Sequence, residues 1–274
     1  MNSIDAYFRM SVIDGALAVC AHKRSYPECT TEIAVRQLRK GPAGYASLDY
    51  TRAVELGSEA GWDAIVIDGD RRAQLRATLL QLALRLRPFW ARTAHLGRRR
   101  VLSVVGDDQW QCLEIAGLLV EPADEGVAKW WDTLAAASRA AEERRKLEIG
   151  REGERLTIEY ESKRLVADGI PQQPKWAALD DNGLGYDVLS FDRDEHQEPR
   201  NKYIEVKACA YSPLHFFLTR NEWNFAVAHK KESAFQIWNL EAEEVTELRV
   251  KEMAKHIPDD HGGGLWQKVA VVLS

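Results

Sequence analysis

The 274-residue sequence predicts a mainly α-helical N-terminal domain over residues 1–123 and an α/β C-terminal domain over residues 148–274. A helical connector is expected over residues 124–147. Apolar residues recur at helical spacing before the connector, whereas short apolar runs separated by turn residues dominate after it. The second half reads as helix, three strands, helix and strand, an order that indicates a mixed sheet flanked by helices. With 45% apolar and 29% charged residues, the chain has a folded rather than a disordered composition.

The N-terminal elements are predicted from their caps and from the glycines and prolines that end them. Helices are expected over residues 31–39, 47–60, 70–87 and 107–119, with a short strand over residues 64–67. The first two helices are separated by Gly41-Pro42, which is compatible with a helix-turn-helix. Neither helix has the features of a recognition helix, so the pattern alone does not establish that motif.

The C-terminal half is predicted to contain several short strands as well as helices. Helices are expected over residues 150–166 and 219–230, and strands over residues 175–179, 185–191, 202–208, 235–240 and 266–273. The turn sequence Asp180-Asp181-Asn182-Gly183 separates the first two strands, and a polar loop over residues 192–201 joins the next pair as a hairpin. Thr219-x-x-Glu222 has the form of a capping box at the start of the second helix.

The net charge of −5 conceals an uneven distribution. Residues 1–147 carry 21 basic and 19 acidic residues, whereas residues 148–274 carry 16 basic and 23 acidic residues. Residues 71–100 contain nine arginines and no acidic residue, which favours contact with a phosphate backbone. A solvated helix face, or neutralisation by acidic residues elsewhere, is the alternative. The candidate DNA-binding residues are Arg71, Arg72, Arg98, Arg99 and Arg100.

The sequence lacks the signals of membrane-spanning, secreted and ATP-hydrolysing proteins. No apolar run approaches the roughly 20 residues that span a bilayer, and the N-terminus does not resemble a secretion signal. The four cysteines are scattered without a C-x-x-C pair, as expected for reduced thiols in the cytoplasm. No phosphate-binding loop of the ATPase type occurs. We therefore expect a cytoplasmic protein without membrane contact.

Asp187, Glu205 and Lys207 are the most informative residues. Residues two apart in a strand share a face, so Glu205 and Lys207 project together. If the strands on either side of the 192–201 loop pair, Asp187 approaches Glu205. Converging carboxylates repel each other unless a cation lies between them, and Mg²⁺ (or Mn²⁺ in its place) takes oxygen ligands. The alternative for an isolated E-x-K pattern is an exposed, ion-paired strand face.

Four blocks in order carry a family resemblance. They are Gly150-Arg151-Glu152-Gly153-Glu154, Gly185-Tyr186-Asp187-Val188, Tyr203-Ile204-Glu205-Val206-Lys207 and Thr219-x-x-Glu222. Together they resemble the domain found at the C-terminus of the plant protein NO VEIN and in bacterial defence proteins. That domain is similar to the PD-(D/E)XK, or restriction-endonuclease-like, superfamily. The resemblance covers about residues 148–240 and implies a core of helix, three strands, helix and strand.

The resemblance also implies roles for individual residues. Asp187 and Glu205 stand at the positions of the metal-binding acids, and Lys207 at that of the motif lysine. Glu154 matches a helical glutamate that supports the metal, sometimes through water. Tyr186 replaces the proline of the motif, a departure that leaves the essential groups present. Glu161 shares the helix face of Glu154 and is a reserve candidate, whereas Glu222 is expected to act as a cap.

These residues lead us to expect a Mg²⁺-dependent DNA endonuclease of restriction or anti-phage defence. A catalytically silent DNA-binding or scaffold subunit of a larger defence complex is the first alternative. A nuclease acting on RNA or on modified DNA is the second. A homodimer is expected only because cutting two strands often requires two active sites.

Overall fold

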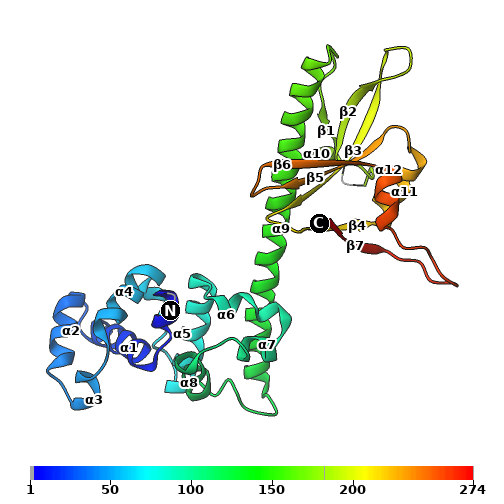
Figure 1. The fold of residues 1–274 in the computed structure, drawn as a ribbon. Helices are drawn as coiled ribbons and strands as arrows, with labels where there is room; N and C mark the ends of the chain where they lie inside the picture. Colours follow the sequence, from blue (N-terminus) through cyan, green and yellow to red (C-terminus); the bar gives the residue numbers. More distant parts are fainter. Residues whose placement is uncertain (1–2, 182, 274) are drawn as a thin grey trace. The chain divides into compact units, whose positions relative to one another are not determined.

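The computed structural model describes residues 3–181 and 183–273, which divide into two compact units, Met1–Glu142 and Glu143–Ser274 (Figure 1). Helix α9 (Glu125–Ala167) contributes residues to both units. The connector and the first C-terminal helix, expected as two elements, therefore form one continuous helix. Within the described residues, no helix combines the length and apolar character needed to cross a membrane.

The N-terminal unit is helical, as predicted. Its α-helices are α1 (Met10–Ser25), α2 (Thr31–Arg39), α3 (Ala43–Ala46), α4 (Tyr50–Ala60), α5 (Arg71–Leu86), α6 (Phe89–Arg92), α7 (Arg98–Leu102) and α8 (Asp107–Ile115). The 3-10 helices are η1 (Ser3–Tyr7), η2 (Trp62–Ala64) and η3 (Ala94–Leu96). Side chains of α1, α4, α5, α8 and the first part of α9 form one apolar core.

Caps explain where these helices begin. Thr30 accepts the Ile33 N–H at the start of α2, and Asp70 accepts the Ala73 N–H at the start of α5, so both predicted starts are confirmed. The predicted helix over residues 47–60 begins later, because Asp49 caps α4 and the short helix α3 precedes it. The helix predicted to reach residue 119 ends earlier, at Ile115.

The strand predicted over residues 64–67 is wrong. Residues up to Ala64 form the 3-10 helix η2 instead. Val66 donates its N–H to the Thr78 hydroxyl at 2.9 Å, and Thr78 is fully buried in α5. A side chain therefore satisfies the backbone group that a neighbouring strand would have paired with.

The C-terminal unit contains the predicted mixed sheet. Its strands are β1 (Lys175–Trp176), β2 (Val188–Arg193), β3 (Pro199–Cys209), β5 (Ser233–Asn239) and β6 (Glu244–Arg249), in the order β1-β2-β3-β5-β6. Strands β3 and β5 are parallel and the other pairs antiparallel. A separate antiparallel pair is formed by β4 (Leu214–Thr219) and β7 (Lys268–Leu273).

Short helices complete this unit. They are α10 (Ala177–Asp180), α11 (Arg220–Ala228), α12 (Val250–Met253) and η4 (Ala254–His256). The capping box predicted at Thr219 and Glu222 is confirmed at the start of α11. The strand predicted over residues 175–179 is reduced to the two residues of β1, because Ala177 begins α10. Asn182 of the predicted turn lies outside the described residues.

The two faces of the sheet are covered differently. Helix α9 packs on one face, where a Cβ built on Gly153 would lie 2.7 Å from the Ala208 Cβ of β3. Residues of β4, β7, α11 and α12 pack with Phe235 and Ile237 of β5 in the main core of the unit. Glycine at position 153 thus lets α9 lie directly against β3.

Candidate active site

Pairing of β2 with β3 brings Asp187 to Glu205. Val188 is opposite Ile204, so the register continued by one residue places Asp187 opposite Glu205. Two hydrogen bonds fix Asp187: its N–H donates to the Ile204 carbonyl at 2.9 Å, and its Oδ2 accepts the Val206 N–H at 2.7 Å. The predicted approach of the two carboxylates therefore follows from the antiparallel ladder.

Lys207 lies between two carboxylates. Its Nζ donates to Glu205 Oε1 at 2.7 Å and to Glu222 Oε2 at 3.1 Å. The same Glu222 oxygen accepts the Thr219 N–H at 2.8 Å, as part of the capping box of α11. The sequence assigned Glu222 to capping alone, whereas the structure shows that it also holds the lysine. The capping-box spacing predicts where α11 begins but not which side chain its acid meets, so no sequence signal indicated this second contact.

Burial dominates the electrostatics of the site. It raises the pKa of Asp187 to about 6, against the lowering effects of the Val206 N–H and Lys207 and with further raising by Glu154 and Glu222. Burial also raises the pKa of Glu205 well above its usual value, and the charge of Lys207 offsets this only in part. The pKa of Lys207 is raised, because the surrounding carboxylates outweigh its own burial. The site therefore has an excess of negative charge that a further cation would stabilise.

Glu154 reaches the same region from α9. Its Oε2 accepts hydrogen bonds from the Trp176 indole and from Arg151 Nη1, the latter at 2.9 Å. Its charge contributes to the raised pKa of Asp187, so the two groups interact electrostatically. Trp176 was not singled out by the sequence, since a tryptophan in an apolar run is usually a core residue.

The residues present fit a divalent metal held by two carboxylates. No hydrogen bond to a described residue involves Asp187 Oδ1 or Glu205 Oε2, so each acid offers one oxygen. Mg²⁺ is commonly held by one or two carboxylates together with waters and substrate phosphate oxygens. Across residues 3–181 and 183–273, no group of three or more His, Cys, Asp or Glu side chains could hold a metal ion. The structure thus does not make Glu154 a third direct ligand, and its role beside the metal stays a prediction.

An aromatic cluster supports the backbone at Asp187. Tyr186 packs against Tyr203 and Phe225, with ring centroids 4.9 and 5.1 Å apart. Gly185 has a φ of +83°, and a Cβ there would lie 2.7 Å from the Phe225 Cβ. The Gly-Tyr pair therefore turns the chain closely past α11 before the aspartate. This explains why Gly185 and the aromatic residue Tyr186 directly precede Asp187 in the sequence.

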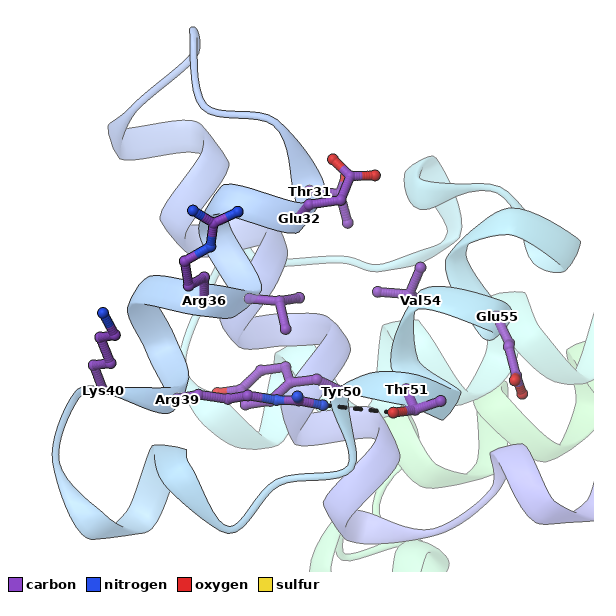
Figure 2. Close-up of a pocket in the computed structure, with 10 residues that line it drawn as sticks. Thr31, Glu32, Arg36, Arg39, Lys40, Tyr50, Thr51, Val54 and Glu55 are labelled. Carbon is purple, nitrogen blue, oxygen red and sulfur yellow. Dashed lines mark hydrogen bonds between the residues drawn. The ribbon is translucent and has the colours of Figure 1, made fainter.

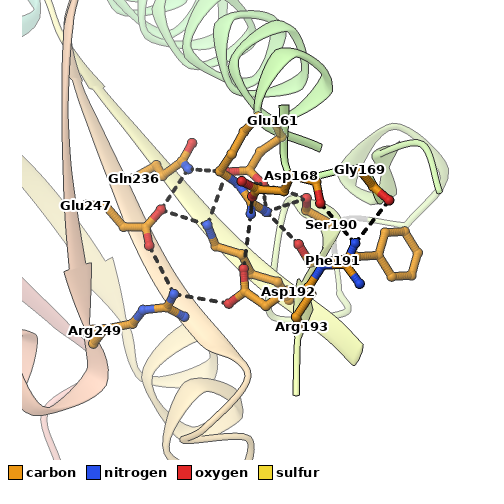
Figure 3. Close-up of polar contacts among 12 residues, drawn as sticks. Glu161, Asp168, Gly169, Ser190, Phe191, Asp192, Arg193, Gln236, Glu247 and Arg249 are labelled. Carbon is orange, nitrogen blue, oxygen red and sulfur yellow. Dashed lines mark hydrogen bonds and ion pairs between the residues drawn. The ribbon is translucent and has the colours of Figure 1, made fainter. Parts of the chain in front are cut away.

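Glu161 belongs to a buried polar cluster on the α9 face of the sheet (Figure 3). Its Oε1 accepts from Lys202 Nζ at 3.1 Å and from Gln236 Nε2 at 2.8 Å, and its Oε2 accepts from Ser190 at 2.6 Å and from Arg164 at 2.6 Å. Lys202, only 2% exposed, also donates to Glu247 at 2.8 Å. Glu161 therefore connects α9 to β2, β3 and β5 and, through Lys202, to β6. We call Glu161, Lys202, Ser190, Gln236, Arg164 and Glu247 the Glu161 cluster.

The Glu161 cluster and the candidate active site are built on the same elements. Glu161 follows Glu154 by seven residues in α9, a rise of roughly 10 Å. Lys202 precedes Glu205 by three residues in β3, and Ser190 follows Asp187 by three, each also about 10 Å along a strand. The cluster thus fixes the register of α9, β2 and β3, the elements that position the site. The reserve role of Glu161 in catalysis is not supported by this geometry, because its side chain is fully buried among Lys202, Ser190 and Gln236.

The arginine segment of the N-terminal unit is partly internal. Arg71 pairs with Asp14 at 3.0 Å, and Arg98 donates to the Val120 carbonyl and pairs with Glu121. The side chains of Arg72, Arg99 and Arg100 are exposed and make no hydrogen bond or ion pair with a described residue, which leaves them available to phosphate. The five predicted DNA contacts stay a prediction, with these three as the stronger candidates.

One comparison with known proteins finds a match. Residues 153–248 match the family described as Protein NO VEIN, C-terminal. The matched segment contains Glu154, Asp187, Glu205, Lys207 and Glu222. No curated protein matches the chain, and no solved structure does. The C-terminal unit is therefore similar to the C-terminal domain of NO VEIN, as the sequence blocks indicated.

Proposed function

We propose that the protein is a metal-dependent endonuclease that hydrolyses phosphodiester bonds in DNA. The observation that carries the proposal is the convergence of Asp187 and Glu205 beside Lys207, with both carboxyl pKa values raised. Such a site binds a divalent cation between its acids and holds an ammonium group next to it. The PD-(D/E)XK superfamily, which the sequence blocks resemble, uses this combination.

Each residue has a defined part in the proposed reaction. Asp187 and Glu205 would hold Mg²⁺, or Mn²⁺ in its place, which stabilises negative charge on the phosphate and lowers the pKa of a bound water. Lys207 orients the attacking water or neutralises charge as it develops on the phosphate. Glu222 positions Lys207, and Glu154 would support the metal. The arginines of the N-terminal unit would bind DNA, and restriction or anti-phage defence is the setting we propose.

Cleavage of supercoiled plasmid tests this proposal. The full-length protein should nick or linearise DNA with Mg²⁺ or Mn²⁺ and lose this activity in EDTA. Asp187→Ala and Lys207→Ala should each abolish it, whereas Glu195→Gln, in the exposed turn of the β2–β3 hairpin, should retain it. Equal cleavage by all four proteins would reject the site assignment. A parallel RNA substrate distinguishes the two kinds of nucleic acid.

A catalytically silent module is the second candidate. The observation that favours it is that Lys207 already pairs with Glu205 at 2.7 Å and with Glu222 at 3.1 Å, so two of the acids have a cationic partner without a metal. In this case the C-terminal unit would serve as a DNA-binding or scaffold subunit of a multi-protein defence complex. Titration with Mn²⁺ in the presence of DNA separates the candidates. Retained DNA affinity without Mn²⁺ binding and without nicking would identify the module.

A further inference from the structure

A cavity of about 710 Å³ lies between α2 and α4 of the N-terminal unit (Figure 2). We call it the α2–α4 cavity. Its volume lies within the 300–1,000 Å³ range typical of small-ligand sites. Val35 of α2 and Val54 of α4 give it apolar walls, and Tyr50 lines it from the first turn of α4. It therefore has the size and the apolar character of a site for a small organic group.

The Arg39 guanidinium, which lies over the Tyr50 ring, forms a flat platform in this cavity. The Tyr50 side chain is fully buried, and its hydroxyl has no hydrogen-bond partner among the described residues. The Arg39 guanidinium lies 5.9 Å from the centroid of the Tyr50 ring and makes only a long, 3.5 Å hydrogen bond to Thr51. Figure 2 shows the guanidinium extending across the ring. Because the ring is fully buried, the exposed guanidinium above it is the surface offered to a ligand, and a guanidinium plane is suited to stacking against a planar heteroaromatic group.

Charged side chains of both signs line the cavity, among them the acids Glu32 of α2 and Glu55 of α4. Arg36 of α2 and Lys40, which directly follows that helix, are exposed, and neither side chain has a hydrogen bond or ion pair with a described residue. Figure 2 places these cations on one side and Glu55 of α4 on the other. Cations without partners favour a phosphate, and a carboxylate favours the amino group of a base. The charge layout thus specifies an anionic end and a hydrogen-bond-donating end of one ligand.

We propose that the α2–α4 cavity binds one nucleotide unit. Its base stacks on the Arg39 guanidinium, with an amino group directed to Glu55. Its phosphate contacts Arg36 and Lys40. The unit is either a free nucleotide or a nucleotide turned out of a DNA strand, as enzymes that read single bases do. The proposal concerns the N-terminal unit and does not depend on cleavage by the C-terminal site.

Calorimetric binding in EDTA tests the proposal on the full-length chain. The probes are the four 2′-deoxynucleoside 5′-monophosphates, inorganic phosphate, and a short oligonucleotide in single-stranded and double-stranded form. Val54→Trp fills the cavity without removing a charge, and Arg39→Ala removes the platform. Lys129→Ala removes an exposed cation elsewhere in the same unit and is the matched control. Circular dichroism identifies variants that fail to fold, and Arg39→Ala keeps the test valid if Val54→Trp does not fold.

The expected result is that at least one monophosphate or oligonucleotide binds tenfold more tightly than inorganic phosphate. That binding should weaken at least tenfold in Val54→Trp and Arg39→Ala and stay unchanged in Lys129→Ala. If the cavity variants lose affinity for a monophosphate, the ligand is a free nucleotide. If they lose affinity for the oligonucleotide alone, the ligand is a nucleotide within a strand. Binding no tighter than that of phosphate, or unaffected in the folded cavity variants, would overturn the proposal. Asp187→Ala should bind like the wild type, which separates this test from that of the nuclease.

Discussion

Replacing Lys202 by Met tests the Glu161 cluster as the interaction that holds α9 on the sheet. Methionine keeps most of the apolar stem but removes two charge-assisted hydrogen bonds, to Glu161 at 3.1 Å and to Glu247 at 2.8 Å. Breaking a buried ion pair by removing one partner costs about 3–5 kcal/mol, because the remaining charge is left uncompensated. Glu161 keeps Arg164 as a second cation, so we expect the lower end, about 3 kcal/mol.

Hydrogen exchange followed by mass spectrometry measures this loss locally, which matters because a chain of two units need not unfold in one step. A change of about 3 kcal/mol corresponds to roughly a hundredfold faster exchange of the β2 and β3 amides. The amides of α4 and α5 in the N-terminal unit provide an internal control. Glu159→Gln, which removes two exposed ion pairs on α9, should leave all of them unchanged. Less than a fivefold change in β2 and β3 would refute the stabilising role of the cluster.

Two further predictions concern charge and packing at the site. Burial raises the pKa of Asp187 to about 6, above the pKa of the same carboxyl in the unfolded chain. Folding stability is therefore highest below the unfolded pKa, where Asp187 is protonated in both states, and is lost as the pH rises through 6. Asp187→Asn should therefore stabilise the C-terminal unit by roughly 1–2 kcal/mol at pH 8 while abolishing cleavage, and destabilisation in hydrogen exchange would contradict this. Gly153→Ala places a Cβ 2.7 Å from that of Ala208 and should destabilise the unit by about 1–3 kcal/mol in the same assay. Gly150→Ala, whose Cβ meets nothing within 4 Å, should instead stabilise α9 by up to about 1 kcal/mol, and equal effects would contradict the close approach.

The sequence predicted the elements whose signals are local. Helix α2 and the start of α5 follow from their caps, and the approach of Asp187 to Glu205 follows from strand alternation and a hairpin. Strand β6 was not predicted, because its residues Glu244–Arg249 are mostly charged or polar and lie at the edge of the sheet. Strand β4 was missed because it pairs with β7, about 50 residues later in the chain.

Long-range contacts account for what the sequence did not predict at the site. Lys202 begins the strand predicted over residues 202–208, whose charged residues suggest exposure. Only its pairing with Glu161 and Glu247 in the structure explains why it is buried. The contact of Glu222 with Lys207 joins α11 to β3, and that of Trp176 with Glu154 joins β1 to α9. None of these contacts has a periodic or local signature, because each depends on how separate elements pack.

The most direct test of the nuclease assignment is the single-turnover rate of DNA cleavage in saturating Mn²⁺, measured with the full-length protein in excess. Lys207→Met should bind DNA within about threefold of the wild type, yet cleave it at least a hundredfold more slowly, as expected for loss of one group that stabilises transition-state charge. Glu195→Gln should cleave at the wild-type rate. A Lys207→Met protein that binds and cleaves DNA as fast as the wild type would contradict the assignment of the Asp187, Glu205 and Lys207 site.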